Sequence, residues 1–130
     1  MKIEPYQPTT LYRDWGEEIL IAETPTYLGK VLKMKAGTKG GLQFHRQKEE
    51  TFYLFSGKAI VRSDDADLRI LRQRVMQPGE SYHIPPGAVH QVEALTDCVF
   101  FEASTPHHND RVRVEALYGL PGDGGLPTTP

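Results

Sequence analysis

The chain has 130 residues, of which 38% are hydrophobic and 25% are charged, and its formal net charge is −2. This composition is typical of one globular domain, and the weak negative charge gives no support for binding to nucleic acid or to an anionic membrane. The single cysteine, Cys98, excludes an internal disulfide. The first residues contain no apolar signal segment and no stretch is apolar enough to span a membrane, so we expect a cytoplasmic protein.

The N-terminal part of the chain predicts extended structure. Pro5 and Pro8 exclude a helix from residues 1–14, which we expect to form an extended segment. An edge strand is predicted at residues 19–22. The next predicted strand, residues 27–36, is interrupted by three lysines. These lysines indicate either that the strand is half exposed or that a cation faces a polar cavity.

The middle of the chain, with its frequent glycines and prolines, predicts many short strands. The most strand-like run, residues 50–55, is rich in aromatic and β-favouring residues. It ends at a tight turn around Gly57, which predicts a hairpin with residues 59–62. The other predicted strands are residues 42–45, 68–76, 81–84, 90–95 and 98–103.

The C-terminal part is less regular. Residues 111–118 are expected to form a last strand or a short helix, and residues 119–130, which are rich in glycine and proline, are expected to form a flexible tail. The chain is therefore expected to contain an N-terminal segment at residues 1–14, a β-barrel domain at 15–118 and the tail at 119–130. Short strands separated by regular turns favour an all-β sandwich or jelly-roll barrel.

Four side chains of the predicted strands have the chemistry of a metal site: Gln43, His45, Glu50 and His90. Gln43 and His45 are separated by one residue, so on a strand they point to the same face. Imidazole, carboxylate and amide groups together can hold a divalent metal such as zinc, iron, manganese or nickel. Gln47 has the same parity and is a competing ligand, but the spacing described next favours Gln43.

The first of two motifs runs from Gly37 to Gly57. Five residues separate Gly37 from Gln43, and one residue separates Gln43 from His45. Four residues separate His45 from Glu50, and six separate Glu50 from Gly57. This spacing resembles the first motif of the cupin superfamily, which has His at the position of Gln43.

The second motif runs from Gly79 to His90 and resembles the second cupin motif. Gly79, Pro85, Gly87 and His90 have the family spacing, whereas Ala94 stands where the family has Asn. The two motifs in this order imply a cupin-type double-stranded β-helix, that is, a jelly-roll barrel. The resemblance also implies a divalent metal bound by the four residues named above, with zinc as the first candidate and iron, manganese or nickel as others.

Within this superfamily the chain resembles the cupin domain of phosphomannose isomerases. The resemblance covers roughly residues 14–119. It implies a mannose-6-phosphate isomerase-like isomerase or epimerase that acts on a sugar or sugar phosphate. Beside Leu42–His45, the residues that carry it are Trp15 and Gly16, Lys30 and Lys35, residues 112–115, and Tyr118 and Gly119.

Three positions depart from the phosphomannose isomerase pattern. Leu120 replaces an Arg, Ala116 replaces an Asp, and Gly41 replaces a Ser. If the missing Arg serves the phosphate or the reacting sugar, the metal site can persist without isomerase activity. Two alternatives therefore stand beside the isomerase: a non-haem metal dioxygenase with similar ligands, and a non-catalytic cupin that binds a small carbohydrate.

Candidate catalytic residues lie near the two motifs. Lys48 matches a Lys that follows the Gln-x-His stretch of phosphomannose isomerases, Arg62 is a candidate anion contact, and His83 lies beside the second motif. Lys48 could equally be a solvated surface residue, an exposed charge is the commoner outcome for a strand residue such as Arg62, and His83 either lines the cavity or faces solvent. By analogy with small cupins we expect a homodimer, with the N-terminal segment as a candidate for exchange between the subunits.

Overall fold

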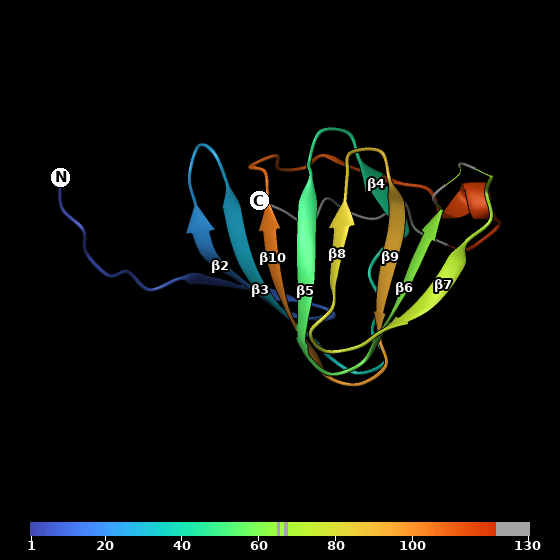
Figure 1. Cartoon of the computed structure of the whole chain (residues 1–130), viewed down its shortest axis with the longest axis horizontal. Coiled ribbons are helices and arrows are strands. Elements are labelled where there is room, and N and C mark those ends of the chain that lie inside the picture. The colour runs from blue at the N-terminus through green and yellow to red at the C-terminus, as the bar shows by residue number, and fades with distance from the viewer. Residues whose placement is uncertain (65, 67, 122–130) are drawn as a thin grey trace.

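The computed structural model describes residues 1–64, 66 and 68–121. In chain order the elements are β1 (Thr9–Arg13), β2 (Gly16–Glu23), β3 (Leu28–Met34), β4 (Gln43–His45), β5 (Glu50–Ser56), β6 (Ala59–Asp64), β7 (Arg72–Met76), β8 (Ser81–Ile84), β9 (Val89–Ala94), β10 (Cys98–Ser104), β11 (Arg111–Arg113) and the 3₁₀ helix η1 (Glu115–Tyr118). They are shown in Figure 1. No helix within the described residues is long and apolar enough to cross a membrane.

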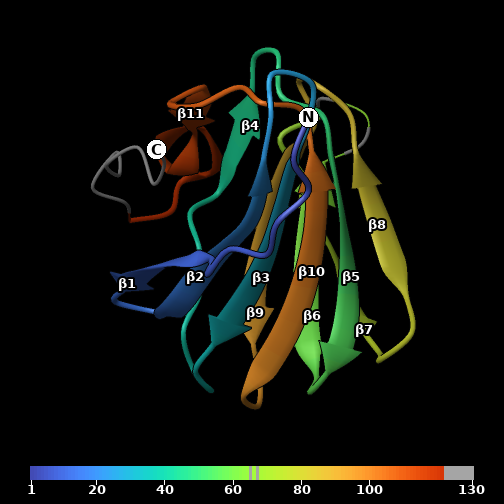
Figure 2. The same cartoon turned by 90° about the vertical axis from the view of Figure 1, so that its left-hand side faces the viewer.

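The strands form two antiparallel sheets that face each other (Figure 2). Sheet A has the order β1-β2-β3-β10-β5-β8, and sheet B has the order β11-β4-β9-β6-β7. Strands that follow each other in the chain often lie in different sheets, as β4 and β5 do. This is the jelly-roll architecture that the sequence predicts, and side chains from both sheets can meet inside it.

The interior between the sheets changes from apolar to polar along the strands. On β10, Cys98, Phe100, Glu102 and Ser104 are buried and alternate with more exposed residues. The first two belong to the apolar core, whereas Glu102 and Ser104 form a polar pair inside the barrel. The polar end of the interior therefore holds charged side chains that a uniformly apolar core would exclude.

Gly57 ends the first motif because no other residue fits there. Its φ angle is 99°, and a Cβ atom at this position would lie 2.3 Å from the carbonyl oxygen of Asp97. Gly87, in the turn of the second motif, also has a positive φ of 86°, and its N–H donates to the carbonyl of His45 at 2.8 Å. The second of these glycines directly links the two motifs.

Three segments differ from the sequence prediction. Residues 19–22 belong to β2, which is not an edge strand, because β1 pairs along its outer side. The predicted strand at 68–76 is shorter and begins at Arg72. Residues 111–118 contain both a strand and a 3₁₀ helix, since β11 is followed by η1. Most of the predicted tail, residues 122–130, lies outside the described residues.

Candidate metal centre

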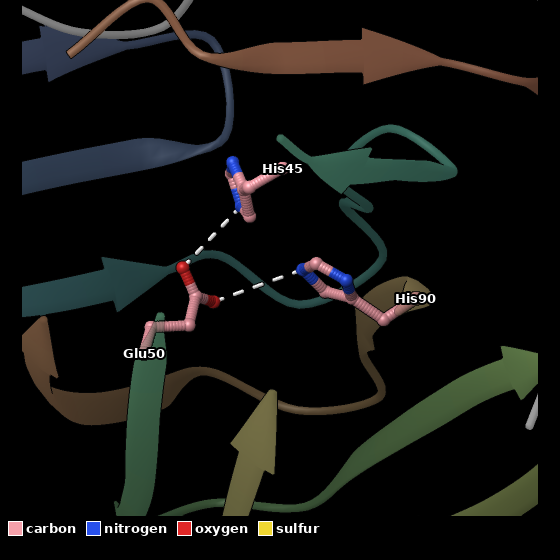
Figure 3. A group of neighbouring side chains, drawn as sticks. All are labelled: His45, Glu50 and His90. Atoms are coloured by element: carbon pink, nitrogen blue, oxygen red, sulfur yellow. Dashed lines mark ion pairs between the residues drawn. The ribbon is translucent and has the colours of Figure 1, made fainter. Parts of the chain in front are cut away.

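Three buried ligand side chains meet inside the barrel (Figure 3). His45 ends β4, Glu50 begins β5 and His90 lies on β9. Their ligand atoms all lie within 4.8 Å of one another. His45 Nε2 is 3.4 Å from Glu50 Oε2, and His90 Nε2 is 3.7 Å from Glu50 Oε1. One carboxylate between two imidazoles is an arrangement that can hold a divalent metal ion.

Gln43 adds an oxygen to this group. It lies directly opposite His90 in the β4–β9 pair, and opposed residues of an antiparallel pair project to the same face. Its Oε1 is buried and has no hydrogen-bond partner within residues 1–64, 66 and 68–121. A buried acceptor without a partner is costly, and a bound cation would satisfy it. The donor set therefore fits a divalent metal with Gln43, His45, Glu50 and His90 as ligands.

The competing ligand of the sequence analysis, Gln47, is in a different position. It lies beyond the end of β4, its side chain is exposed, and its backbone N–H donates to Asp110 at 2.7 Å. The geometry favours Gln43 over Gln47.

The imidazole of His90 is oriented by its own backbone. Its Nδ1 lies 2.9 Å from the carbonyl oxygen of Ala88. A carbonyl only accepts hydrogen bonds, so Nδ1 carries the proton and Nε2 keeps its lone pair toward Glu50. Burial lowers the pKa of His90 despite the nearby Glu50 carboxylate, which favours the neutral ring that a metal requires.

Glu50 is held in its ionised form. Burial alone would raise its pKa, but the hydrogen bond with His45 and the charges of Lys48 and His90 outweigh burial and lower the pKa well below its ordinary value. Lys48 Nζ lies 3.2 Å from Glu50 Oε2 and 3.1 Å from Glu102 Oε2. Burial alone would lower the pKa of Lys48, yet Glu102 and Glu50 raise it, so Lys48 remains a cation.

The four candidate metal ligands line a cavity of about 1050 Å³. Basic side chains outnumber carboxylates on its walls. The charged residues that line it, apart from Glu50, are Arg13, Asp14, Glu18, Lys30, Lys39, Lys48, Arg62, Glu102, Arg111, Arg113 and Glu115.

A buried chain of charges crosses the wall formed by sheet A. Lys30 is only 2% exposed, and its Nζ lies 3.1 Å from Glu18. Glu18 also pairs with Arg13 of the edge strand β1 at 2.7 Å. Of the two interpretations given for the lysines of this strand, the second holds for Lys30, since its cation faces the polar cavity.

The short strand β11 brings two arginines beside the metal ligands. Arg111 lies opposite His45 and Arg113 lies opposite Gln43. Arg113 is bound by Glu115, whose Oε2 also accepts the backbone N–H of Leu42 at 3.1 Å. Arg113 and Glu115 therefore connect the C-terminal part of the chain to the start of β4.

The three proposed catalytic candidates have different surroundings. Lys48 is buried next to Glu50, as described above. Arg62 lines the cavity but is bound by Gln73 at 3.0 Å and by Gln91 at 3.2 Å, and it also pairs with Glu93. His83 is exposed, pairs with Glu49 at 2.5 Å and lines a separate cavity of about 1070 Å³. The structure therefore brings Lys48 to the metal ligands but leaves His83 outside their cavity.

The sequence analysis missed several residues of the cavity. Glu102 was not singled out, although it has the same parity as the apolar Cys98 and Phe100 in its strand. A charged residue among the inward-facing positions of an otherwise apolar strand face could have indicated this role for Glu102. Arg111 gave no such signal, because β11 has no clear alternation.

The sequence model of the cupin domain family matches residues 30–98, which is more than half of the chain. The chain therefore belongs to the cupin family. The matched range includes all four proposed metal ligands and excludes β1, β2 and β11.

One curated relative is mannose-1-phosphate guanylyltransferase RfbM of Salmonella typhimurium. It is 25% identical to the chain over 119 residues, which are 88% of this chain and 24% of RfbM. The chain thus spans about a quarter of the length of that relative.

Solved structures with the same fold include sugar-related proteins and an enzyme of another class. CapF, the capsular polysaccharide assembling protein of Staphylococcus aureus, matches with a TM-score of 0.75 at 23% identity over 85% of this chain and 32% of CapF. A putative sugar phosphate isomerase of Acidithiobacillus ferrooxidans has a TM-score of 0.55 at 18% identity over 67% of this chain and 54% of its own. Oxalate decarboxylase of Lactobacillus farciminis has a TM-score of 0.68 at 19% identity over 84% of this chain and 34% of its own. At these identities the likeness shows the fold alone.

Proposed function

We propose that this cupin binds a divalent metal through Gln43, His45, Glu50 and His90 and acts as an isomerase or epimerase of a sugar or sugar phosphate. Zinc is the first metal to test, followed by iron, manganese and nickel. The observation that carries the proposal is the convergence of His45, Glu50 and His90 on the wall of a large, polar and basic cavity, which the buried Gln43 also lines. Such a cavity suits a hydrophilic, anionic small molecule.

The relatives support a sugar substrate. RfbM is named for mannose 1-phosphate, and the protein from Acidithiobacillus ferrooxidans is named for a sugar phosphate. The resemblance to phosphomannose isomerases in the two motifs points to the same class. A proton transfer between neighbouring carbons would then be the reaction.

The residues of the cavity supply specific parts of such a reaction. The metal, when bound, polarises a carbonyl or adjacent hydroxyl groups. Glu102 is a buried carboxylate that faces this region without being one of the four ligands, so it is our candidate base. Lys48, at 3.1 Å, and Ser104, at 3.0 Å, fix its orientation. Lys48 also ties Glu102 to Glu50, so the base and the metal ligand share one cation.

One observation favours a non-catalytic carbohydrate-binding protein as the second candidate. Leu120 lines the cavity at a position where phosphomannose isomerases commonly carry Arg. An apolar side chain there removes a potential contact with phosphate. Saturable sugar binding without turnover would support this second function, and oxygen uptake by an iron-loaded protein would support the dioxygenase alternative.

The metal content of the purified protein is the first test. Elemental analysis is combined with NMR assays of aldose–ketose and epimer interconversion on hexoses and hexose phosphates, using wild type and His90→Ala. We expect one metal per chain and turnover that His90→Ala abolishes. A protein that cannot be loaded with any divalent metal would contradict the proposal.

We also propose that two copies of this chain pair through the outer face of sheet A. Tyr53, Phe55 and Phe101 form an exposed aromatic group there, with ring centroids 6.1 Å and 5.3 Å apart. The segment before β1 extends away from its own barrel (Figure 1), and its Ile3 is fully exposed. A second copy would cover both surfaces. Light scattering should show a dimer that Phe101→Asp dissociates, and a wild-type monomer would refute the pairing.

A further inference from the structure

The cavity contains an arginine that neither of the two motifs predicts. Arg111 is the first residue of β11 and lies directly opposite His45 of β4. Opposed residues in an antiparallel pair project to the same face, so the Arg111 side chain lies on the face that carries the metal ligand. Consistently, Arg111 lines the same cavity as His45, Glu50 and His90.

The charges around Arg111 come from β11 itself and from three other strands, β1, β2 and β5. The positive charges of Arg113 and Arg13 disfavour the charged form of Arg111, whereas the negative charges of Glu50 and Glu18 favour it. Burial, followed by the charge of Arg113, lowers the pKa of Arg111 to about 10. Arg111, Arg113 and Arg13 all line this cavity, where basic side chains outnumber carboxylates, so the cavity favours an anion.

The neighbouring Arg113 has a different role. It is bound by Glu115, and Glu115 also accepts the backbone N–H of Leu42. Arg113 therefore contributes to the packing of β11 against β4, and it positions the strand that presents Arg111. A guanidinium on a fixed strand is suited to bidentate recognition of an oxyanion.

We propose that Arg111 binds an oxyanion group, phosphate or carboxylate, of the molecule that the metal centre receives. The inference rests on the proposed function and narrows it, because it makes the substrate a small anionic polyol. Its charged group lies at β11 and its hydroxyl or carbonyl oxygens lie toward the metal ligands of β4, β5 and β9. Arg111 thereby supplies a contact that Leu120 cannot make.

Calorimetric titration tests this assignment. Inorganic phosphate and acetate are titrated separately into zinc-loaded wild type, Arg111→Gln and Arg111→Lys, followed by glucose 6-phosphate, glucuronate and uncharged glucose. We expect one oxyanion class to bind, and Arg111→Gln to weaken that binding roughly tenfold or more. Arg111→Lys keeps the charge but loses the planar fork, so its affinity should be intermediate. The phosphate and acetate series show which oxyanion is recognised.

Arg74→Gln is the matched control, since Arg74 is an exposed arginine on β7 outside this cavity. It should bind the anions like wild type. Equal affinity of wild type and Arg111→Gln, with equal zinc content, would overturn the inference, because the anion would then bind the metal alone. Failure of wild type to bind either anion would overturn it as well.

The outcomes also separate this inference from the proposed function. Anion binding that depends on Arg111, without turnover of any sugar phosphate, would uphold the inference and contradict the isomerase. Turnover that Arg111→Gln leaves unchanged would uphold the isomerase and contradict the inference.

Discussion

Gln43 and His90 are direct cross-strand partners in the β4–β9 pair. One belongs to the first sequence motif and the other to the second, and 46 residues separate them in the chain. Their pairing places the buried amide oxygen of Gln43 on the same face as the imidazole of His90. The proposed metal centre therefore depends on strand register, and its candidate ligands should respond individually to substitution.

Replacing His90 with Ala should abolish metal binding. The loss of a direct ligand should weaken affinity by more than the roughly 10–100-fold typical of losing an outer-shell partner. Metal content after dialysis, measured by elemental analysis, should fall to background. His83→Ala is the control, because His83 is exposed and outside the cavity, and this variant should retain its metal. Equal metal in both variants would show that the ion is bound elsewhere.

Gln43→Met should affect the metal-free and metal-loaded proteins in opposite directions. Without metal, the substitution removes a buried oxygen that lacks a partner among the described residues, and we expect about 1 kcal/mol of added stability. With metal, it removes a ligand and should lower the affinity. Urea unfolding with and without metal measures both effects. A variant that is less stable than wild type without metal, and that binds the metal as tightly as wild type does, would rule out Gln43 as a ligand.

Glu102→Gln should separate catalysis from metal binding. The amide keeps the shape and a hydrogen-bond acceptor for Lys48 but cannot take a proton. Turnover should fall by roughly 10²–10⁴-fold, the usual contribution of a general base. Metal content should remain as in wild type. If the variant retains full turnover, the base must be another group.

Asp110 should make the stability of the loop before β5 dependent on pH. Its Oδ2 accepts the backbone N–H groups of Gln47 and Lys48, each at 2.7 Å. Burial alone would raise the pKa of Asp110, but these hydrogen bonds lower it below its ordinary 3.8. A carboxyl group whose pKa is lowered by folding stabilises the folded state above its ordinary pKa, and this contribution disappears as the pH falls below it.

Asp110→Asn should therefore destabilise the protein at pH 7 by about 1 kcal/mol, a modest loss because the carboxylate is partly solvated. The difference from wild type should shrink as the pH is lowered from 5 to 3. Urea unfolding at several pH values measures it. A difference that stays constant across this range would contradict the assignment.

The sequence predicted the parts of the site that depend on local pattern. Alternation placed Gln43 and His45 on one face, and motif spacing added Glu50 and His90. The lysines of residues 27–36 indicated either a half-exposed strand or a cation that faces a polar cavity, and the structure shows the second for Lys30. These features depend on the period of a strand and on short spacings, which can be read directly from the chain.

Other parts of the site depend on long-range pairing, which the local pattern does not contain. Arg111 reaches the cavity because β11 pairs with β4, more than sixty residues away. Likewise, Arg13 belongs to the cavity only because β1 pairs with β2 and brings it to Glu18. Glu102 of β10 meets Lys48 of the loop before β5, although the two residues are far apart in the chain. Such register is decided by the packing of whole sheets.

The four proposed metal ligands come from both sheets. Glu50 belongs to sheet A, whereas Gln43, His45 and His90 belong to sheet B. An ion held by all four residues would be bonded to both layers. Its bonds to one layer would break when the two layers move apart at that point. Release should therefore be governed by an opening motion of the protein, so the rate at which a chelator strips the metal should level off as the chelator concentration rises.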